Sequence, residues 1–291
     1  MRRLVTLLVS AVVVAGLVVT GLPPGDAPHR SDPVAPVVSS TPSFVIASFN
    51  LLGHSHTERG GKFARMSSGH VRLGRTAALF RQYNIAVAGL QEVHPPQYRV
   101  LRNRLAGYDV YPGPGVAQRN KQNVIVWKSS QFSLVKGASV QIPYKRGRLV
   151  PMPVVKLRHR STGTEFWVVS VHNAPGKSRK ARASKRKALA RQVALTNRLL
   201  SGGDAVFMTG DMNDREGYFC RYTASRRMVA AAGGTRTATR CVPPPARRAQ
   251  IDWVFGSRAH VSFSEYRFLR TPAVRRTSDH PLVLARATFR G

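Results

Sequence analysis

Residues that can bind a metal ion or transfer a proton stand at the ends of apolar segments in this chain. The apolar segment 205–208 leads into Gly210-Asp211-Met212-Asn213, so a carboxylate and an amide follow a predicted strand closely. Gly210 would let the backbone approach whatever binds there, although an isolated Gly-Asp-x-Asn segment is more typical of a turn. Similar polar residues recur at other predicted strand ends. Together they are Asn50, Glu92, His172, Asp211, Asn213, Asp252, Asp279 and His280.

The types of these residues indicate metal-assisted hydrolysis of a phosphate ester. Carboxylate and amide oxygens suit Mg²⁺, Mn²⁺ or Ca²⁺, and histidine can transfer protons near neutral pH. Zinc is less expected, because the sequence has neither a His-x-x-x-His pair nor cysteine ligands at metal-site spacing. Glu92 at the end of an apolar strand costs desolvation unless a cation offsets its charge. His54 and His56 lie in a loop, where solvation is favoured over metal binding as their role.

Strands and helices must bring these residues together. We expect strands that are apolar on both faces to form the centre of a sheet, and helices where apolar residues recur at helical spacing. A hairpin is expected at 260–270, and a helix with a loop at 220–241. The other predicted strands and hairpin arms lie at 43–50, 85–92, 124–127, 132–144, 154–159, 165–172, 205–208, 251–255 and from 282, and the helices at 70–83 and 180–200.

The charge balance favours a polyanionic partner. The chain has 46 Lys and Arg against 13 Asp and Glu, a net charge of +33, and such a field attracts nucleic acid or another polyanion. An anionic membrane or cell-wall polymer is the second candidate partner, and a basic surface without a dedicated ligand is the third reading. Cations at the start of the 180–200 helix oppose its dipole, which favours a phosphate-binding patch over a merely solvated face. These cations are Lys177, Arg179, Lys180, Arg182, Lys185, Arg186 and Lys187.

The N-terminal segment predicts export. Residues 1–22 combine two arginines with an apolar run, as in a signal peptide or an uncleaved membrane anchor, and residues 23–42 read as a disordered linker. We therefore expect an extracellular protein, secreted or anchored on the outer face of the cytoplasmic membrane. Cys220 and Cys241 are the only cysteines, and in an oxidising compartment they predict one disulfide.

The order of the polar segments resembles the endonuclease/exonuclease/phosphatase superfamily, which includes pancreatic deoxyribonuclease, abasic-site endonucleases, neutral sphingomyelinases and inositol-polyphosphate phosphatases. The resemblance implies a four-layer α/β sandwich over residues 43–291, with two mainly antiparallel sheets packed face to face and helices outside. The matching segments are Phe49-Asn50, Gln91-Glu92, Val171-His172-Asn173, Gly210-Asp211-Met212-Asn213, Ile251-Asp252-Trp253 and Ser278-Asp279-His280-Pro281.

The resemblance also implies a role for each acid and amide. Glu92, oriented by Asn50, would bind the essential Mg²⁺ or Mn²⁺, with Ca²⁺ in a structural or synergistic role. Asp279 would bind the same ion or a second one. Asp211 would position or deprotonate the attacking water, and Asn213 would donate a hydrogen bond to the scissile phosphate.

Two histidines and several cations would act on the phosphate itself. The resemblance implies that His172 and His280 stabilise or protonate phosphoryl oxygens, with Asp252 orienting His280. Arg148 matches a basic position in some nuclease members, and we add it to the predicted phosphate-binding residues. The remaining members of that set are Lys177, Arg179 and Lys180, besides Asn213.

The leading functional interpretation is a metal-dependent nuclease that cuts DNA, or RNA in a second version, as a monomer without a protein partner. A sphingomyelinase or phospholipase C-like enzyme, or a phosphomonoesterase, is the first alternative. No aromatic-rich hairpin tip suited to membranes is evident, and the nearest segment, Tyr144-Lys145-Arg146, is basic. The second alternative is a non-catalytic surface protein that binds polyanions.

Overall fold

One compact unit contains every predicted site residue. It comprises the described residues between positions 41 and 290. The predicted export segment 1–22 lies outside the part of the chain that can be described, as does the predicted linker 23–42 apart from its last two positions. Within the described ranges, no helix is both long enough and apolar enough to cross a membrane. The computed structural model describes residues 41–116, 122–245, 247 and 250–290.

The first of two large sheets contains the predicted strands near residues 43–50 and 85–91. Its strands among the described residues are, in spatial order, β13 (Val261–Leu269), β14 (Leu282–Phe289), β1 (Ser43–Asn50), β2 (Ile85–Gln91), β4 (Val124–Lys128) and β3 (Tyr108–Tyr111). Every residue of β2 is buried, as expected for a strand that is apolar on both faces. The β1–β2 pair is parallel and the other pairs are antiparallel.

The second sheet repeats this arrangement. In spatial order its strands are β5 (Phe132–Pro143), β6 (Leu149–His159), β7 (Glu165–His172), β8 (Ala205–Asp211), β12 (Asp252–Ser257) and β9 (Met228–Ala230). The β7–β8 pair is parallel and the others are antiparallel. The prediction of mainly antiparallel sheets is therefore confirmed, with one parallel pair at the middle of each.

The two sheets pack face to face. Phe44 of β1 stacks on Phe166 of β7 with ring centroids 5.3 Å apart, in a core that both inner faces share. The two sheets approach closely at Gly89 of β2, where a Cβ atom would lie 2.0 Å from the side-chain oxygen Oγ1 of Thr209 in β8. A larger residue at Gly89 would therefore push the sheets apart.

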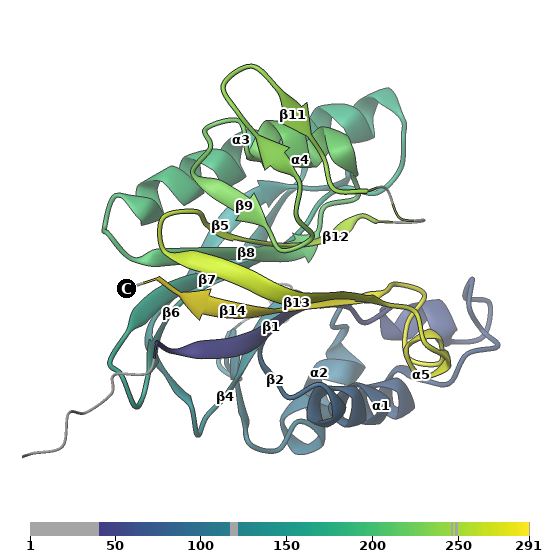
Figure 1. Ribbon diagram of the computed structural model, residues 1–291. Coiled ribbons are helices and arrows are strands. Elements are labelled where there is room, and N and C mark those ends of the chain that lie inside the picture. The colour runs from purple at the N-terminus through teal and green to yellow at the C-terminus, as the bar shows by residue number, and fades with distance from the viewer. Residues whose placement is uncertain (1–40, 117–121, 246, 248–249, 291) are drawn as a thin grey trace, which may run out of the picture. The chain divides into compact units, whose positions relative to one another are not determined.

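Helices cover the outer faces, which completes the predicted four-layer sandwich (Figure 1). The first sheet is covered by α1 (Gly69–Gln82) and α2 (Pro95–Arg104). The second is covered by α3 (Arg179–Leu200) and α4 (Glu216–Tyr222). The predicted amphipathic character of α3 is confirmed, because Leu189, Leu195 and Leu200 are buried while most of its cations are exposed.

Two local predictions were wrong. Residues 260–270 do not form a hairpin: β13 is a single strand that pairs along β14, while the preceding β12 belongs to the other sheet. Its alternation of polar and apolar residues suits an edge strand with one covered face. Region 220–241 also holds short strands besides its helix. The other elements among the described residues are β10 (Thr235–Arg236), β11 (Cys241–Val242), α5 (Pro272–Arg275) and the short 3₁₀ turns η1 (His54–Thr57) and η3 (Lys145–Gly147).

The predicted disulfide between Cys220 and Cys241 is present, with Cα atoms 5.8 Å apart. The bond joins α4, a helix of the outer layer, to β11, and so holds the two ends of the segment between them together.

Candidate active site

Four strand ends from the two sheets meet at one edge of the sandwich. The parallel strands β1 and β2 place Asn50 beside Gln91, and Glu92 follows at once. The parallel strands β7 and β8 place His172 beside Asp211. Because the carboxyl ends of parallel strands are where α/β sheets hold ligands, both sheets present polar side chains to the same space.

Asn50 connects the two sheets at this point. Its side chain is fully buried, and Nδ2 donates to Glu92 Oε1 at 3.1 Å and to Asp211 Oδ2 at 3.2 Å. Its Oδ1 accepts from the Leu52 backbone N–H at 3.0 Å, and its carbonyl accepts from Ser278 Oγ at 2.7 Å. With both side-chain atoms committed, Asn50 orients the two carboxylates rather than facing solvent.

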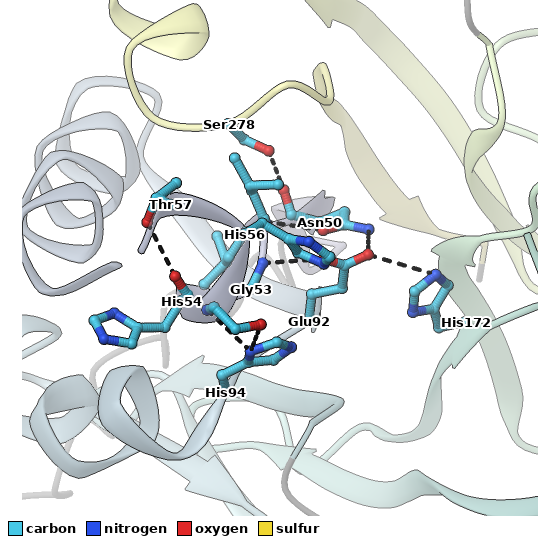
Figure 2. A network of polar contacts seen from close by, with 12 residues as sticks. Asn50, Gly53, His54, His56, Thr57, Glu92, His94, His172 and Ser278 are labelled. Atoms are coloured by element: carbon cyan, nitrogen blue, oxygen red, sulfur yellow. Dashed lines mark hydrogen bonds and ion pairs between the residues drawn. The ribbon is translucent and has the colours of Figure 1, made fainter. Parts of the chain in front are cut away.

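Glu92 presents a carboxylate whose two oxygens face different partners (Figure 2). Oε1 lies 3.1 Å from Asn50 Nδ2 and 3.9 Å from His172 Nε2, whereas Oε2 accepts from the Gly53 N–H at 3.0 Å and lies 3.3 Å from His56 Nε2. Burial alone would raise the pKa of Glu92, but the His172 imidazole and these hydrogen bonds lower it below its ordinary range. The side chain is therefore ionised at neutral pH, as a metal ligand must be.

Asp211 lies at the centre of the site. Its Oδ2 is 3.3 Å from His172 Nε2 and 3.8 Å from His280 Nε2, and its Oδ1 accepts from the Asn213 backbone N–H at 2.8 Å. Burial alone would raise the pKa of Asp211, but the hydrogen bond with His172, the charges of both imidazoles and the Asn213 N–H lower it. Asp211 is thus a buried, ionised carboxylate that can accept a hydrogen bond from water.

His280 and Asp252 form a buried pair behind Asp211. Nδ1 of His280 lies 3.0 and 3.2 Å from the two Asp252 oxygens, and Asp252 is itself fully buried. Burial alone would lower the pKa of His280, but Asp252 and Asp211 outweigh it and raise the pKa to about 10. Nδ1 therefore donates to Asp252, and Nε2–H of the imidazolium faces the site.

The end of β8 and the loop after it depend on two special backbone positions. At Gly210 of β8, a Cβ would lie 2.2 Å from the Val171 carbonyl oxygen of the neighbouring strand, so the two strands pack closely there. Asn213 adopts φ +49°, in the left-handed region that asparagine tolerates. Its Nδ2 donates to the Asn173 carbonyl at 3.0 Å, which leaves the second proton of the amide for a ligand.

Asp279 carries a buried oxygen that a cation would satisfy. Among the described residues its Oδ1 has no hydrogen-bond partner, whereas its backbone carbonyl accepts from Arg270 Nη2 at 3.3 Å. Buried polar atoms are normally paired with a donor or an ion. This oxygen and the ionised carboxylate of Glu92 are donors of the kind that a divalent metal prefers.

A pocket of about 480 Å³ brings these groups together. The predicted residues Asn50 and Asp252 do not line it and support it from behind. The predicted residues in its lining are Glu92, His172, Asp211, Asn213, Asp279 and His280, and the others are Leu52, Ser55, His56, Lys62, Phe63, His94, Gln122, Tyr144, Lys145 and Pro175.

The predicted phosphate-binding cations lie further out. Arg148 is exposed at the end of the η3 turn and does not line this pocket, whereas Lys145 of the same turn does. Lys177 lines a neighbouring hollow of about 730 Å³ that shares Asn213 with the pocket. Arg179 and Lys180 are exposed on the first turn of α3 and line neither space.

A buried arginine that sequence reasoning missed holds the site loops in place. Arg72 of α1 is 1% exposed, and its guanidinium donates to the carbonyls of Ser67, Leu51, Leu52 and Thr277. Burial lowers its pKa to about 10 although nearby acids oppose this. Among 46 Lys and Arg, no feature of the sequence distinguishes Arg72 from a surface residue.

Two further pocket residues are not among the predicted site residues. His94 lines the pocket, and its position two residues after Glu92 is the signal in the sequence that indicates this. Tyr144 also lines the pocket, although the sequence suggests only a hairpin tip there. Its ring packs edge-on against His172, with centroids 5.2 Å apart.

Solved structures share this fold at low sequence identity. An endonuclease/exonuclease/phosphatase family protein from Bacteroides thetaiotaomicron is 17% identical with a TM-score of 0.67, over 86% of this chain and 99% of that chain. The mannosyl-6-phosphatase Bt3783 of the same species is 15% identical with a TM-score of 0.61, over 85% and 100%. TDP2 from D. rerio, complexed with a single strand DNA product, is 13% identical with a TM-score of 0.59, over 84% and 99%.

The sequence comparisons agree with the geometry. No match was found among curated protein sequences. Residues 47–280, however, match the Endonuclease/Exonuclease/phosphatase family, a span that begins within β1 and ends at His280. The match therefore covers all the strand ends that build the pocket, and the chain belongs to the endonuclease/exonuclease/phosphatase family.

Proposed function

We propose that this protein is a metal-dependent phosphodiesterase that hydrolyses nucleic acid, with DNA as the leading substrate. Members of its family are phosphoric ester hydrolases and are generally dependent on a divalent metal. The observation that carries the proposal is the position of a cationic hollow beside the pocket, with Asn213 in the lining of both. A phosphate chain cut at Asp211 would continue into that hollow.

Each side chain of the site has a separate role in the proposed hydrolysis. Asp211 accepts a proton from the attacking water, because its carboxylate is ionised and central. The water oxygen bonds to phosphorus as the P–O bond to the leaving nucleotide breaks, and the leaving oxygen takes up a proton from solvent. Asn213 donates its free amide proton to a non-bridging oxygen. His280, held as an imidazolium by Asp252, offsets the charge that develops on the phosphoryl oxygens, and His172 lies on the other side of Asp211.

A divalent cation would complete this arrangement. Glu92 and Asp279 would hold it, Asn50 orients Glu92, and Mg²⁺, Mn²⁺ or Ca²⁺ all accept such oxygen donors. When bound, the cation supplies positive charge next to the phosphate and polarises its oxygens.

The cationic hollow supports a polynucleotide over a small phosphate ester. Lys185 holds two lining residues of the hollow in place, because its Nζ donates to the Gly176 carbonyl at 3.0 Å and to the Asn213 carbonyl at 2.9 Å. A single-phosphate substrate would fill the site pocket alone, whereas a nucleic acid presents further phosphates to the neighbouring cations. The basic residues in the lining of the hollow are Lys177, Arg182, Lys185, Arg186, Arg215 and Arg221.

The other interpretations have weaker support. A phosphomonoesterase is favoured only by the similarity to the mannosyl-6-phosphatase fold, which the whole family shares. Against a sphingomyelinase, Tyr144 packs on His172 instead of pointing outward from the hairpin tip. A non-catalytic polyanion-binding protein would not need the ionised, hydrogen-bonded set at Asp211, Glu92 and His280.

We also propose that the protein acts outside the cell and as a monomer. The apolar segment after two arginines supports export, and the disulfide suits an oxidising compartment. Detection of the chain in culture medium or on the outer membrane face, with its mass by light scattering, would test both statements.

A digestion panel tests the proposed function. Double-stranded DNA, single-stranded DNA, RNA, sphingomyelin vesicles and a sugar phosphate are each incubated with the protein in Mg²⁺ and in Mn²⁺. We expect cleavage of nucleic acid that stops with chelator, and a loss of about 10²–10⁴ in rate for Asp211→Asn. Hydrolysis of lipid or sugar phosphate with intact nucleic acid would overturn the proposal.

A charge substitution tests the role of the hollow. The double variant Arg182→Glu/Arg186→Glu should lose far more kcat/KM on long DNA than on a small chromogenic phosphodiester, because only the polymer reaches the hollow. Arg191→Glu/Arg198→Glu is the matched control, since both arginines are exposed further along the same helix and line neither space. Equal losses for both variants on DNA would mean that the general charge, not this surface, binds the substrate.

A further inference from the structure

Two imidazole rings stand beside the metal-binding carboxylate. His56 belongs to the η1 turn after β1, and His94 directly precedes α2. One ligand atom each from His56, Glu92 and His94 lie within 4.8 Å of one another, and the two rings have centroids 5.8 Å apart. Figure 2 shows both rings next to Glu92, on the side away from His172.

The two oxygens of Glu92 separate the histidines from the hydrolytic groups. Oε1 contacts Asn50 and faces His172, while Oε2 contacts the Gly53 N–H and lies 3.3 Å from His56 Nε2. A cation on the Oε2 side would therefore reach the imidazoles without displacing the contacts of Oε1.

The position of His94 is fixed by its surroundings. A Cβ at Gly53 would lie 2.2 Å from His94 Nε2, so the ring occupies space that only glycine leaves free. His94 Nδ1 lies 3.3 Å from Ser55 Oγ. Gln97 Oε1 accepts from the backbone N–H groups of His94 at 3.1 Å and His54 at 2.9 Å, and so joins the η1 turn to α2.

The types of these side chains suit a metal ion. Imidazole nitrogen and carboxylate oxygen are both common metal ligands, and each binds in its deprotonated form.

We infer that the cation bound at Glu92 also takes ring nitrogens from His56 and His94, and that the site therefore prefers a first-row transition ion such as Mn²⁺, Co²⁺ or Zn²⁺ to Mg²⁺. Imidazole suits transition ions, whereas Mg²⁺ and Ca²⁺ prefer oxygen ligands. Metal–ligand bonds of about 2.1 Å place three ligand atoms of one ion about 3.0–3.6 Å apart. The three ligand atoms here lie within 4.8 Å of one another, so the two imidazole rings must move toward Glu92 to close the site.

Metal binding without substrate tests this inference. Chelator-treated protein is titrated with Zn²⁺, Mn²⁺ and Mg²⁺ by calorimetry, and bound Mn²⁺ is examined by pulsed electron paramagnetic resonance for coupling to imidazole nitrogen. We expect nitrogen coupling in the wild type and tighter binding of the transition ions. His56→Asn and His94→Asn should each weaken Zn²⁺ binding about 10-fold or more and leave Mg²⁺ binding unchanged.

The controls separate ligation from misfolding. His159→Asn is the matched control, because His159 is the last residue of β6 and does not line the site pocket. Its Nδ1 contacts Thr162 Oγ1. Asparagine at position 94 still suits the start of a helix, and far-UV circular dichroism checks each variant. Bound Mn²⁺ without nitrogen coupling, or Zn²⁺ affinities equal to wild type in both variants, would overturn the inference and leave His56 as a hydrogen-bond partner of Glu92.

The inference rests on the proposed function only in taking Glu92 as the metal ligand of the hydrolytic site. Nucleic acid cleavage in Mg²⁺ without nitrogen ligation would refute the inference and leave the function intact. Nitrogen ligation without any nuclease activity would support the inference and refute the proposed function.

Discussion

The pair of His280 and Asp252 makes the pH dependence of the reaction predictable. His280 keeps its proton at neutral pH because Asp252 outweighs the effect of burial and raises its pKa to about 10, so the alkaline limb of activity should follow that value. Asp252→Asn removes the charge that holds the proton, and the pKa of His280 should fall toward or below the ordinary value of about 6.5. We expect the alkaline limb of the kcat/KM profile to move to lower pH in this variant.

The same pair contributes to stability with a defined sign. The pKa of His280 is higher in the folded than in the unfolded chain, so its stabilising contribution is complete below the unfolded value and is lost as the pH rises through about 10. Asp252→Asn should therefore lose more stability at pH 6 than at pH 10. If the alkaline limb of the kcat/KM profile lies at the same pH in the wild type and in Asp252→Asn, the assigned role of Asp252 is contradicted.

Single residues were predictable from sequence where chemistry constrains their type. Asp211, His172 and Glu92 stand at strand ends, and their acidic or imidazole side chains have few roles in so basic a chain. His94 and Arg72 escaped because their function depends on what they contact: a glycine that leaves space for one ring, and four carbonyl groups that surround one guanidinium.

At the level of elements, Arg72 of α1 should control the geometry of the site without touching substrate. It joins the loop after β1 to the loop before β14 through the Leu51, Leu52 and Thr277 carbonyls. Arg72→Leu removes the donor from the Thr277 carbonyl, at about 1–3 kcal/mol, and leaves the Leu51 and Leu52 carbonyls only the longer contacts with Gln97 Nε2 at 3.5 and 3.4 Å. We expect a large loss of stability in urea unfolding and a fall in kcat greater than the change in KM.

A conservative variant makes this prediction specific. Arg72→Lys keeps the charge but cannot reach every carbonyl, since it has one nitrogen in place of three. It should recover part of the stability and less of kcat. Full activity in Arg72→Lys would show that the charge alone matters, and not the fixed positions of the two loops.

The disulfide gives a second prediction for the elements. Cys220 and Cys241 are 21 residues apart, and a loop of that size corresponds to about 3 kcal/mol of stabilisation on the chain-entropy model. Cys220→Ala/Cys241→Ala should lower the free energy of unfolding by about this amount and leave kcat nearly unchanged at low temperature. Reduction of the wild type should give the same shift, and no shift would mean that the loop is ordered without the bond.

The apolar strands were the easiest elements to predict, because both of their faces are buried. Segment 260–270 was misjudged because its alternating pattern shows one covered face and gives no information about the partner strand. The partner, β14, lies further along the chain, and the preceding strand belongs to the other sheet. Pairing of this kind is set by the assembled sheets and not by local residues.

For the whole molecule, the excess of 33 positive charges makes substrate capture sensitive to salt. The value of kcat/KM for long duplex DNA should fall with NaCl, with a log–log slope near −0.9 for each phosphate contacted. In Arg182→Glu/Arg186→Glu the slope should become less steep by about 2. An unchanged slope between 50 and 200 mM, taken from steady-state rates, would exclude these arginines from the interface.

The contact between the sheets at Gly89 and Thr209 has a consequence for when the enzyme becomes active. Asn50 and Glu92 come from one sheet, and His172 and Asp211 from the other, so neither sheet alone contains a complete site. The site therefore exists only once the two sheets have docked. On the proposed function, a chain that is still unfolded would not cut nucleic acid.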